Sequence, residues 1–143
     1  MKVSVNQSAR AYTRQEIVIA ADIDKVFNLI ANINQWPQWQ SDVSQAIIEG
    51  DPLENKSFIW TGGGMKIKSR LHTVNPPSEF GWTGRIWWIS AVHNWSFENL
   101  GKQTKVVVEE SLGGLFSSLM KSSLEKGMGQ SLQELKRAAE QSN

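Results

Sequence analysis

His93 is the residue of this sequence best suited to acid–base chemistry. It is one of only two histidines, and the alternation of apolar residues around it predicts that its side chain points to the interior of a sheet. If Glu110 points inward on the next strand, the two side chains can pair, with Arg85 near the end of the neighbouring strand. Such a trio inside an apolar cavity could orient a carbonyl or phenol and move a proton. The alternative is structural: His93 and Glu110 satisfy each other, and Arg85 meets solvent or a backbone carbonyl.

Other catalytic chemistries lack their usual residues. The chain has no cysteine, so it forms no disulfide and has no thiol nucleophile. His72 and His93 alone cannot make a metal site of several histidine or cysteine ligands. No Gly-x-Ser-x-Gly motif is present, and Gly62-Gly63-Gly64 lacks the Lys-Ser/Thr of a phosphate-binding loop, which favours a hairpin turn. We therefore predict no metal or other cofactor and no ordinary hydrolase or kinase activity.

Tryptophan is the unusual component of this sequence. All seven tryptophans lie between Trp36 and Trp95, and Trp82 and Trp95 are expected to flank His93 across the strands. Flat apolar walls with few polar groups are typical of a small-molecule pocket, although they equally describe a packed core. The predicted ligand-binding residues are Trp60, Met65, Ile67, Trp82, Arg85, His93, Trp95, Glu110 and Leu119, with Phe58 and Leu71 as further candidates.

Period-two alternation predicts that most of the chain folds as strands. The predicted strands are 12–20, 43–48, 57–61, 65–74, 79–86, 91–100 and 104–112. Short breaks between the last six make them consecutive antiparallel hairpins. Within 65–72, the alternation places His72 on the solvent-facing side together with the basic residues of that strand. After the first strand, the spacing from Val26 to Ile33 and the sequence Trp36-Pro37-Gln38-Trp39 predict two short helices.

A long amphipathic helix is predicted at the C-terminal end, from Gly114 to about Gln141. Its apolar residues recur at steps of three to five and need a large partner surface, which the sheet can provide. Its small residues are Ser117, Ser118, Ser122, Ser123, Gly127 and Gly129. Where these face the sheet they leave space between helix and sheet, whereas those that face solvent merely lower helicity.

Trp87-Trp88 occupies the turn between two predicted strands, a place where Gly, Asn or Pro is usual. Exposed apolar residues at a loop tip often mark the portal of a cavity or a surface for a partner. The alternative is that one of these tryptophans folds back onto the short helices.

Length and composition predict a single domain, residues 1–143, with residues 1–10 flexible. Fifteen basic and fourteen acidic residues give a net charge of +1 with the charges scattered, which argues against nucleic acid as the main partner. The first ten residues lack the apolar run of a signal peptide, and no apolar stretch is long enough to predict a membrane span. A cytoplasmic location is therefore the default expectation.

Several short motifs, taken in order, resemble one family. They are Glu16-Ile17-Val18-Ile19 followed by Val26-Phe27, then Trp36-Pro37-Gln38-Trp39, Gly81-Trp82-Thr83-Gly84-Arg85, His93-Asn94-Trp95-Ser96-Phe97 and Val108-Glu109-Glu110-Ser111-Leu112-Gly113-Gly114. Their order and spacing, from about residue 14 to 140, are similar to the polyketide cyclase/dehydrase branch of the SRPBCC, or START-like, superfamily. The resemblance implies an α+β helix-grip fold, in which a seven-stranded curved antiparallel sheet surrounds a long C-terminal helix and leaves an internal cavity.

The same resemblance implies that a small apolar ligand, lipid-like or aromatic, binds in this cavity. Two alternatives stay open. One is an enzyme of the cyclase or dehydratase type that uses His93 as acid or base. The other is an interaction module of the chaperone-activator type, which would present an exposed surface such as Trp87-Trp88.

Overall fold

The computed structural model describes residues 1–141, so the last two residues of the predicted domain lie outside the described part. The described part contains seven strands, three α-helices and two short 3-10 helices. In chain order they are β1 (Ala11–Ile19), α1 (Ile23–Ala31), η1 (Ile33–Gln35), α2 (Trp36–Trp39), β2 (Val43–Ile47), β3 (Ser57–Gly62), β4 (Met65–Asn75), β5 (Glu79–Ile86), β6 (Ile89–Asn99), β7 (Thr104–Gly113), η2 (Ser117–Met120) and α3 (Lys121–Glu140). Each predicted strand is present, with both ends within two residues of the prediction.

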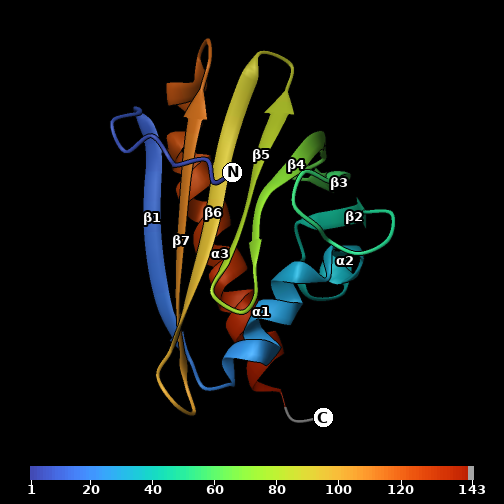
Figure 1. Cartoon of the computed structure of the whole chain (residues 1–143). Coiled ribbons are helices and arrows are strands. Elements are labelled where there is room, and N and C mark those ends of the chain that lie inside the picture. Colours follow the sequence, from blue (N-terminus) through green and yellow to red (C-terminus); the bar gives the residue numbers. More distant parts are fainter. Residues whose placement is uncertain (142–143) are drawn as a thin grey trace.

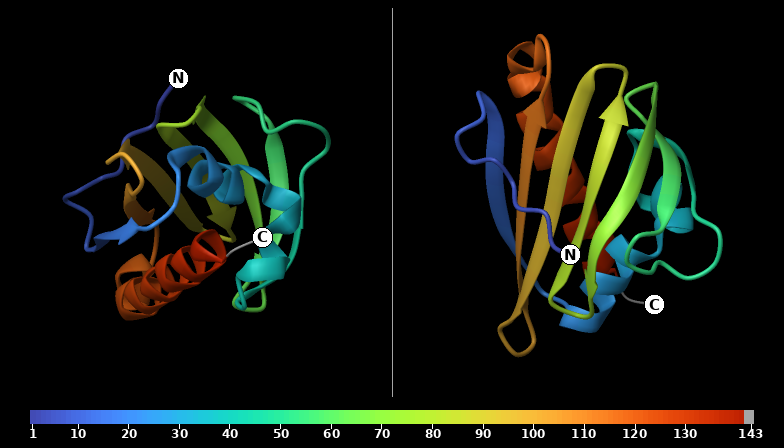
Figure 2. Two further views of the ribbon diagram at one scale, coloured as in Figure 1. Left: turned by 90° about the horizontal axis from the view of Figure 1, so that it is seen from below. Right: turned by 45° about the horizontal axis from the view of Figure 1, so that its top comes forward.

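The seven strands form one antiparallel sheet in the order β1-β7-β6-β5-β4-β3-β2. The sheet curves around α3, and the short helices α1 and α2 lie on the same concave side (Figures 1 and 2). This arrangement confirms the predicted helix-grip fold. No helix in residues 1–141 combines the length and apolar character needed to cross a membrane.

The C-terminal helix starts later than predicted. Residues 114–116 form a turn in which Gly114 and Phe116 both have positive φ angles, +107° and +64°. The short η2 follows, and α3 begins only at Lys121. A side chain at position 114 would place its Cβ 2.2 Å from the backbone oxygen of Trp88, so only glycine fits where β7 leaves the sheet beside the β5–β6 hairpin.

The inner face of the sheet is packed solid in the half nearer to α1. Phe27 of α1 meets Phe80 and Phe97 edge to face, with ring centroids 5.9 and 5.6 Å apart. Leu132 and Leu135 of α3 belong to the same buried cluster. Burial of such side chains contributes about 1.5–3 kcal/mol each, and this cluster therefore anchors α3 to the sheet.

His72 is buried, contrary to the prediction that it faces solvent. It does lie on the outer face of the sheet, but the N-terminal segment covers it there. The backbone N–H of Val3 donates to His72 Nδ1 at 3.2 Å, Asn94 Oδ1 lies 2.8 Å from His72 Nε2, and Asn94 Nδ2 donates to the Val3 carbonyl at 2.8 Å. The N-terminal segment, which was predicted to be flexible, lies against the sheet. There the backbone N–H of Asn6 also donates to Ser111 Oγ.

Candidate functional site

Two adjoining cavities lie between the sheet and the first half of α3. The smaller has a volume of about 180 Å³ and the larger about 400 Å³. Both are lined by Asp42, Trp60, Trp82, Glu110, Ser123 and Leu124, so they meet along this set of residues. The larger cavity reaches the surface of the molecule, because some of its lining residues, among them Gly63 and Arg85, are exposed to solvent.

Helix α3 leaves this space because small residues face the sheet there. Ser123, Gly127 and Ser131, spaced four residues apart on one side of the helix, all line the smaller cavity. A Cβ atom placed on Gly127 would meet no atom within 4 Å. Of the small residues noted in the sequence of this helix, Ser123 and Gly127 line the smaller cavity. Gly129, by contrast, faces Gln15 of β1.

The wall of the smaller cavity is a continuous set of aromatic rings. Trp36 contacts both Trp60 and Trp82, with centroids 5.6 and 5.2 Å apart. Two of these rings are fixed by their N–H groups: Trp36 Nε1 donates to the Ile30 carbonyl at 2.9 Å, and Trp60 Nε1 donates to Ser69 Oγ at 3.1 Å. These two hydrogen bonds hold the Trp36 and Trp60 rings in place, so this part of the wall is preorganised.

His93 and Glu110 are brought together as predicted. They are register partners on β6 and β7, and His93 Nδ1 lies 3.0 Å from Glu110 Oε1, with each side chain only 15% exposed. The His93 ring stacks on Trp82, with centroids 4.5 Å apart and planes within 5°. A carboxylate can only accept, so the proton of a neutral His93 belongs on Nδ1. This leaves Nε2 as a hydrogen-bond acceptor.

Two polar atoms beside this pair have no partner. His93 Nε2 and Trp95 Nε1 are buried and make no hydrogen bond to any atom of residues 1–141. Both residues line the smaller cavity, and their rings lie 5.5 Å apart. A third indole N–H without a partner, that of Trp39, belongs to a residue that lines neither cavity. His93 and Trp95 therefore each carry a polar nitrogen that is buried without a hydrogen-bond partner.

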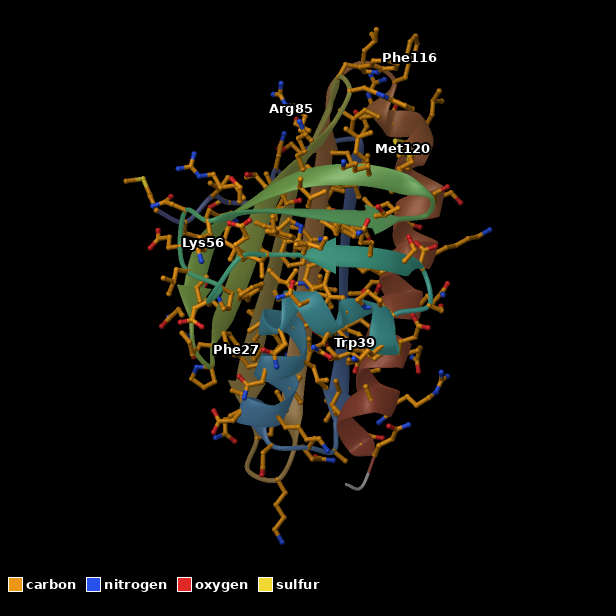
Figure 3. The ribbon with its side chains drawn as sticks, turned by 90° about the vertical axis from the view of Figure 1, so that its right-hand side faces the viewer. Phe27, Trp39, Lys56, Arg85, Phe116 and Met120 are labelled. Atoms are coloured by element: carbon orange, nitrogen blue, oxygen red, sulfur yellow. The ribbon has the colours of Figure 1, made fainter. Side chains whose placement is uncertain are left out.

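Most of the predicted ligand-binding residues lie around these cavities. Trp60, Trp82, His93, Trp95 and Glu110 line the smaller one, and Met65, Ile67 and Arg85 line the larger. Arg85 is exposed at the upper end of β5, so it does not join His93 and Glu110 (Figure 3). Leu119 lies outside both cavities, 78% exposed. Phe58 and Leu71 are core residues.

The sequence analysis missed several lining residues. Trp36 was predicted only as part of a short helix, yet it belongs to the buried core and to the aromatic wall of the smaller cavity. Gln40 and Asp42, in the segment between α2 and β2, also contribute. A polar segment directly after an aromatic helix turn carries no local pattern that marks it as part of a cavity.

Five large apolar side chains are exposed at the end of the molecule where the larger cavity opens. They are Trp87, Trp88, Leu115, Phe116 and Leu119, which we call the apolar rim. Ile86, Ile89 and Met120, their neighbours in sequence, line the larger cavity. Trp88 Nε1 donates to the Leu115 carbonyl at 2.8 Å and so connects the β5–β6 hairpin to the segment after β7. Figure 3 shows Phe116 and Met120 together at this end.

No group of three or more His, Asp or Glu side chains within residues 1–141 is arranged to hold a metal ion. The polar side chains on the cavities include Gln40, Asp42 and Arg85 besides His93 and Glu110.

Comparisons with known proteins agree with this architecture. The family model described as polyketide cyclase / dehydrase and lipid transport matches residues 10–140. No curated protein sequence matches the chain significantly.

Solved structures share the fold at low sequence identity. A hypothetical protein of Helicobacter pylori has a TM-score of 0.80 at 12% identity, covering 97% of this chain and 98% of that one. A START superfamily protein of Mycobacterium smegmatis has a TM-score of 0.78 at 10% identity, covering 90% and 97%. The Zhui aromatase/cyclase of Streptomyces sp. R1128 has a TM-score of 0.79 at 12% identity, covering 90% and 93%.

Proposed function

Because the chain belongs to the polyketide cyclase / dehydrase and lipid transport family of the SRPBCC superfamily, we propose that it binds a small apolar molecule, lipid-like or aromatic, between its sheet and α3. The observation that carries this proposal is the hollow opposite Gly127, about 180 Å³ in its smaller part and about 400 Å³ in its larger part. An aromatic wall with few polar groups is the usual composition of a small-molecule site.

The expected affinity follows from the area that a ligand would bury. Burial contributes about 25 cal/mol per Å², so a ligand that buries roughly 200 Å² of apolar surface gains about 5 kcal/mol. The cost of immobilising the ligand reduces this gain, and the preorganised indole walls keep the reduction small. Dissociation constants of roughly 0.2 mM or weaker are therefore expected for ligands that bury this area.

Filling the hollow from the helix tests this proposal. We expect Gly127→Leu to abolish displacement of a hydrophobic fluorophore by fatty acids or polyphenols, because the new side chain enters the smaller cavity. Ser122→Leu is the matched control, since it adds the same side chain at an exposed position of α3 that lines neither cavity. Equal binding by wild type and Gly127→Leu would contradict the proposal. Mass spectrometry of the purified protein under native conditions would identify a molecule carried from the host.

A second candidate function is an enzyme of the cyclase or dehydratase type. The observation in its favour is the pairing of Glu110 with His93 Nδ1, which orients the imidazole of a residue on the cavity and leaves Nε2 without a hydrogen-bond partner. Loss of turnover with retained binding in His93→Ala, on a polyketide-like substrate, would support this function. Retained turnover in that variant would exclude His93 as the base.

The apolar rim favours a third candidate, an interaction module. Its five exposed apolar side chains form a surface of the kind that binds a protein partner. A partner that co-purifies with the wild type and is lost in Trp88→Ala would support this function. Co-purification unaffected by Trp88→Ala would show that the partner does not bind to the apolar rim.

A further inference from the structure

We infer that the apolar rim docks on the surface of a lipid bilayer that carries anionic headgroups. The rim is continuous in sequence with residues that line the larger cavity, namely Ile86, Ile89 and Met120. Docking therefore brings the opening of this cavity to the bilayer. The inference goes beyond the proposed function, because contact with a bilayer is measured without any ligand.

The rim side chains belong to two connecting segments at the same end of the molecule (Figures 1 and 3). Trp87 and Trp88 form the tip of the β5–β6 hairpin, and their rings stack with centroids 5.7 Å apart. Phe116 and Leu119 follow the end of β7, and all four side chains are more than half exposed. An indole suits the boundary between headgroups and hydrocarbon, since its ring is apolar and its N–H is polar.

Two of the rim residues hold a backbone conformation that ordinarily favours glycine. Trp87 has a φ angle of +50° and Phe116 one of +64°, both in the left-handed region. A large side chain is unfavourable there compared with Gly or Asn. Packing within the protein does not compensate, because both rings are mostly exposed. Aromatic rings at these two positions indicate a contact that the isolated chain does not make.

Exposed basic residues lie on the outer face of the sheet beside the rim. Lys68 of β4 and Arg85 of β5 are register partners, and Arg85 is only two residues before Trp87. Lys66 is two residues from Lys68, so its side chain is on the same face, nearer to the β3–β4 hairpin. None of these three cations forms an ion pair within residues 1–141. Their charge is therefore available to an external partner.

Few acidic residues oppose this positive charge. The stretches 55–78, 80–97 and 111–124, which include both hairpins and the rim, contain no Asp or Glu. Asp42 and Glu110 line the larger cavity, where Glu110 pairs with His93, and Glu125 lies 4.0 Å from Lys121 at the start of α3.

Unpaired cations next to exposed aromatic rings match an anionic bilayer, which attracts the charges and accepts the apolar side chains at the same time. A bilayer is favoured over a protein partner because of the cavity that opens at the rim. For the apolar ligand proposed above, docking there removes the step of crossing water.

Co-sedimentation of the full chain with vesicles tests the inference. One set of vesicles is pure phosphatidylcholine, and the other is an equal mixture of phosphatidylcholine and phosphatidylglycerol. We expect wild type to bind the mixed vesicles at least about tenfold more tightly, because each basic residue near an anionic surface contributes roughly fivefold. High salt should weaken this binding, since it screens exposed charges. Equal binding to both sets, or binding to neither, would overturn the inference.

Variants of the rim test the apolar contact. Trp87→Ala removes a ring that is 73% exposed and should weaken binding to the mixed vesicles at least about fivefold. Leu119→Ala should weaken it in the same direction. Leu100→Ala is the matched control, because it removes an exposed leucine from the β6–β7 hairpin at the opposite end of the molecule (Figure 1). Binding unaffected by Trp87→Ala and Leu119→Ala would overturn the inference.

A double variant tests the charges. Lys66→Gln combined with Lys68→Gln should weaken binding to the mixed vesicles by about tenfold or more. The control combines Lys102→Gln in the β6–β7 hairpin with Arg137→Gln in the last turn of α3, which changes the net charge equally. If the control weakens binding as much as the test variant, net charge alone is responsible and docking through the rim is excluded.

The outcomes also separate this inference from the proposed functions. Displacement of the fluorophore is measured without vesicles, so ligand binding persists if docking fails, and docking persists if ligand binding fails. A protein that co-purifies and is lost in Trp88→Ala, with no vesicle binding by wild type, would assign the rim to a protein partner and overturn the inference.

Discussion

The two halves of the space between the sheet and α3 are built from the same elements but are filled differently. In the lower half, toward α1, Leu132 and Leu135 of α3 are buried in one cluster with Phe27. In the upper half, toward the β5–β6 hairpin, Ser123 and Gly127 occupy the corresponding side of the helix and leave the cavities. Figure 3 shows Phe27 in the lower half and Met120 in the upper.

This difference shows that side-chain volume on one helix face decides whether the fold has a packed core or a cavity. The backbone of α3 is continuous from Lys121 to Glu140, so the change occurs without a break in the helix. Protein interiors are normally close-packed, and a hollow of this size forgoes contacts that the lower half makes. The lower half stabilises the fold, and the upper half is left free to bind a ligand.

The largest expected effect tests the packed half. Leu135 is fully buried, so Leu135→Ala should lower the free energy of unfolding by about 2–5 kcal/mol, measured by urea denaturation. Leu124→Ala, in the hollow half, should cost much less, because Leu124 borders the cavities and already lacks neighbours on one side. Equal losses in both variants would remove the distinction between the halves.

A smaller effect of opposite sign is expected in the hollow half. Gly127→Ala should raise the free energy of unfolding by about 1 kcal/mol, because alanine is the better helix former and its methyl group meets no atom within 4 Å. The same urea experiment measures it. Destabilisation by this change would show that the hollow is smaller than described.

Acidification tests the outer face of the packed half, where His72 lies under the N-terminal segment. Burial lowers the pKa of His72 below its ordinary value of 6.5, although the hydrogen bond to Asn94 opposes this. The unfolded chain therefore takes up the proton first as the pH falls below 6.5, and the free energy of unfolding should decrease until the lower folded-state pKa is reached. Above pH 6.5 this contribution is fully present.

Urea denaturation at a series of pH values measures this effect, and His72→Gln isolates it. The variant should lose the part of the pH dependence that wild type shows below pH 6.5. Hydrogen exchange should report a smaller protection factor for the Val3 amide at low pH in wild type, since protonated Nδ1 cannot accept its hydrogen bond. An identical pH dependence in both proteins would show that His72 does not hold this segment.

The smallest stability effect is expected at the apolar rim. Trp87 is 73% exposed, so Trp87→Ala should change the free energy of unfolding by no more than about 0.5 kcal/mol. Thermal and urea denaturation measure it. A loss comparable to that of Leu135→Ala would mean that the rim is part of the packed structure.

The sheet could be predicted from the sequence because apolar residues alternate along most of its strands. Ala91, His93, Trp95 and Phe97 lie in one row, and this alternation alone places His93 opposite Glu110 once β6 and β7 pair. The cavity was indicated by the small residues of the C-terminal helix, of which Ser123 and Gly127 face it. Local sequence patterns were sufficient to predict the environment of a side chain wherever that environment depends only on its own strand or helix.

The remaining features depend on contacts between distant segments. Leu119 was placed on the inner side of a helix that was expected to start at Gly114, but the turn at Phe116 delays the helix to Lys121 and Leu119 faces solvent. His72 is buried by residues about seventy positions earlier in the chain. Neither the turn nor the covering segment has a sequence pattern that would have indicated it.

The contact between Gly114 and the Trp88 backbone, together with the hydrogen bond from Trp88 Nε1 to Leu115, has a consequence for how a ligand enters. The hairpin tip and the start of the helical region are fastened to each other beside the opening. Moving either segment alone would break that hydrogen bond. A substitution at Gly114 should therefore displace the hairpin tip as well as the start of the helical region.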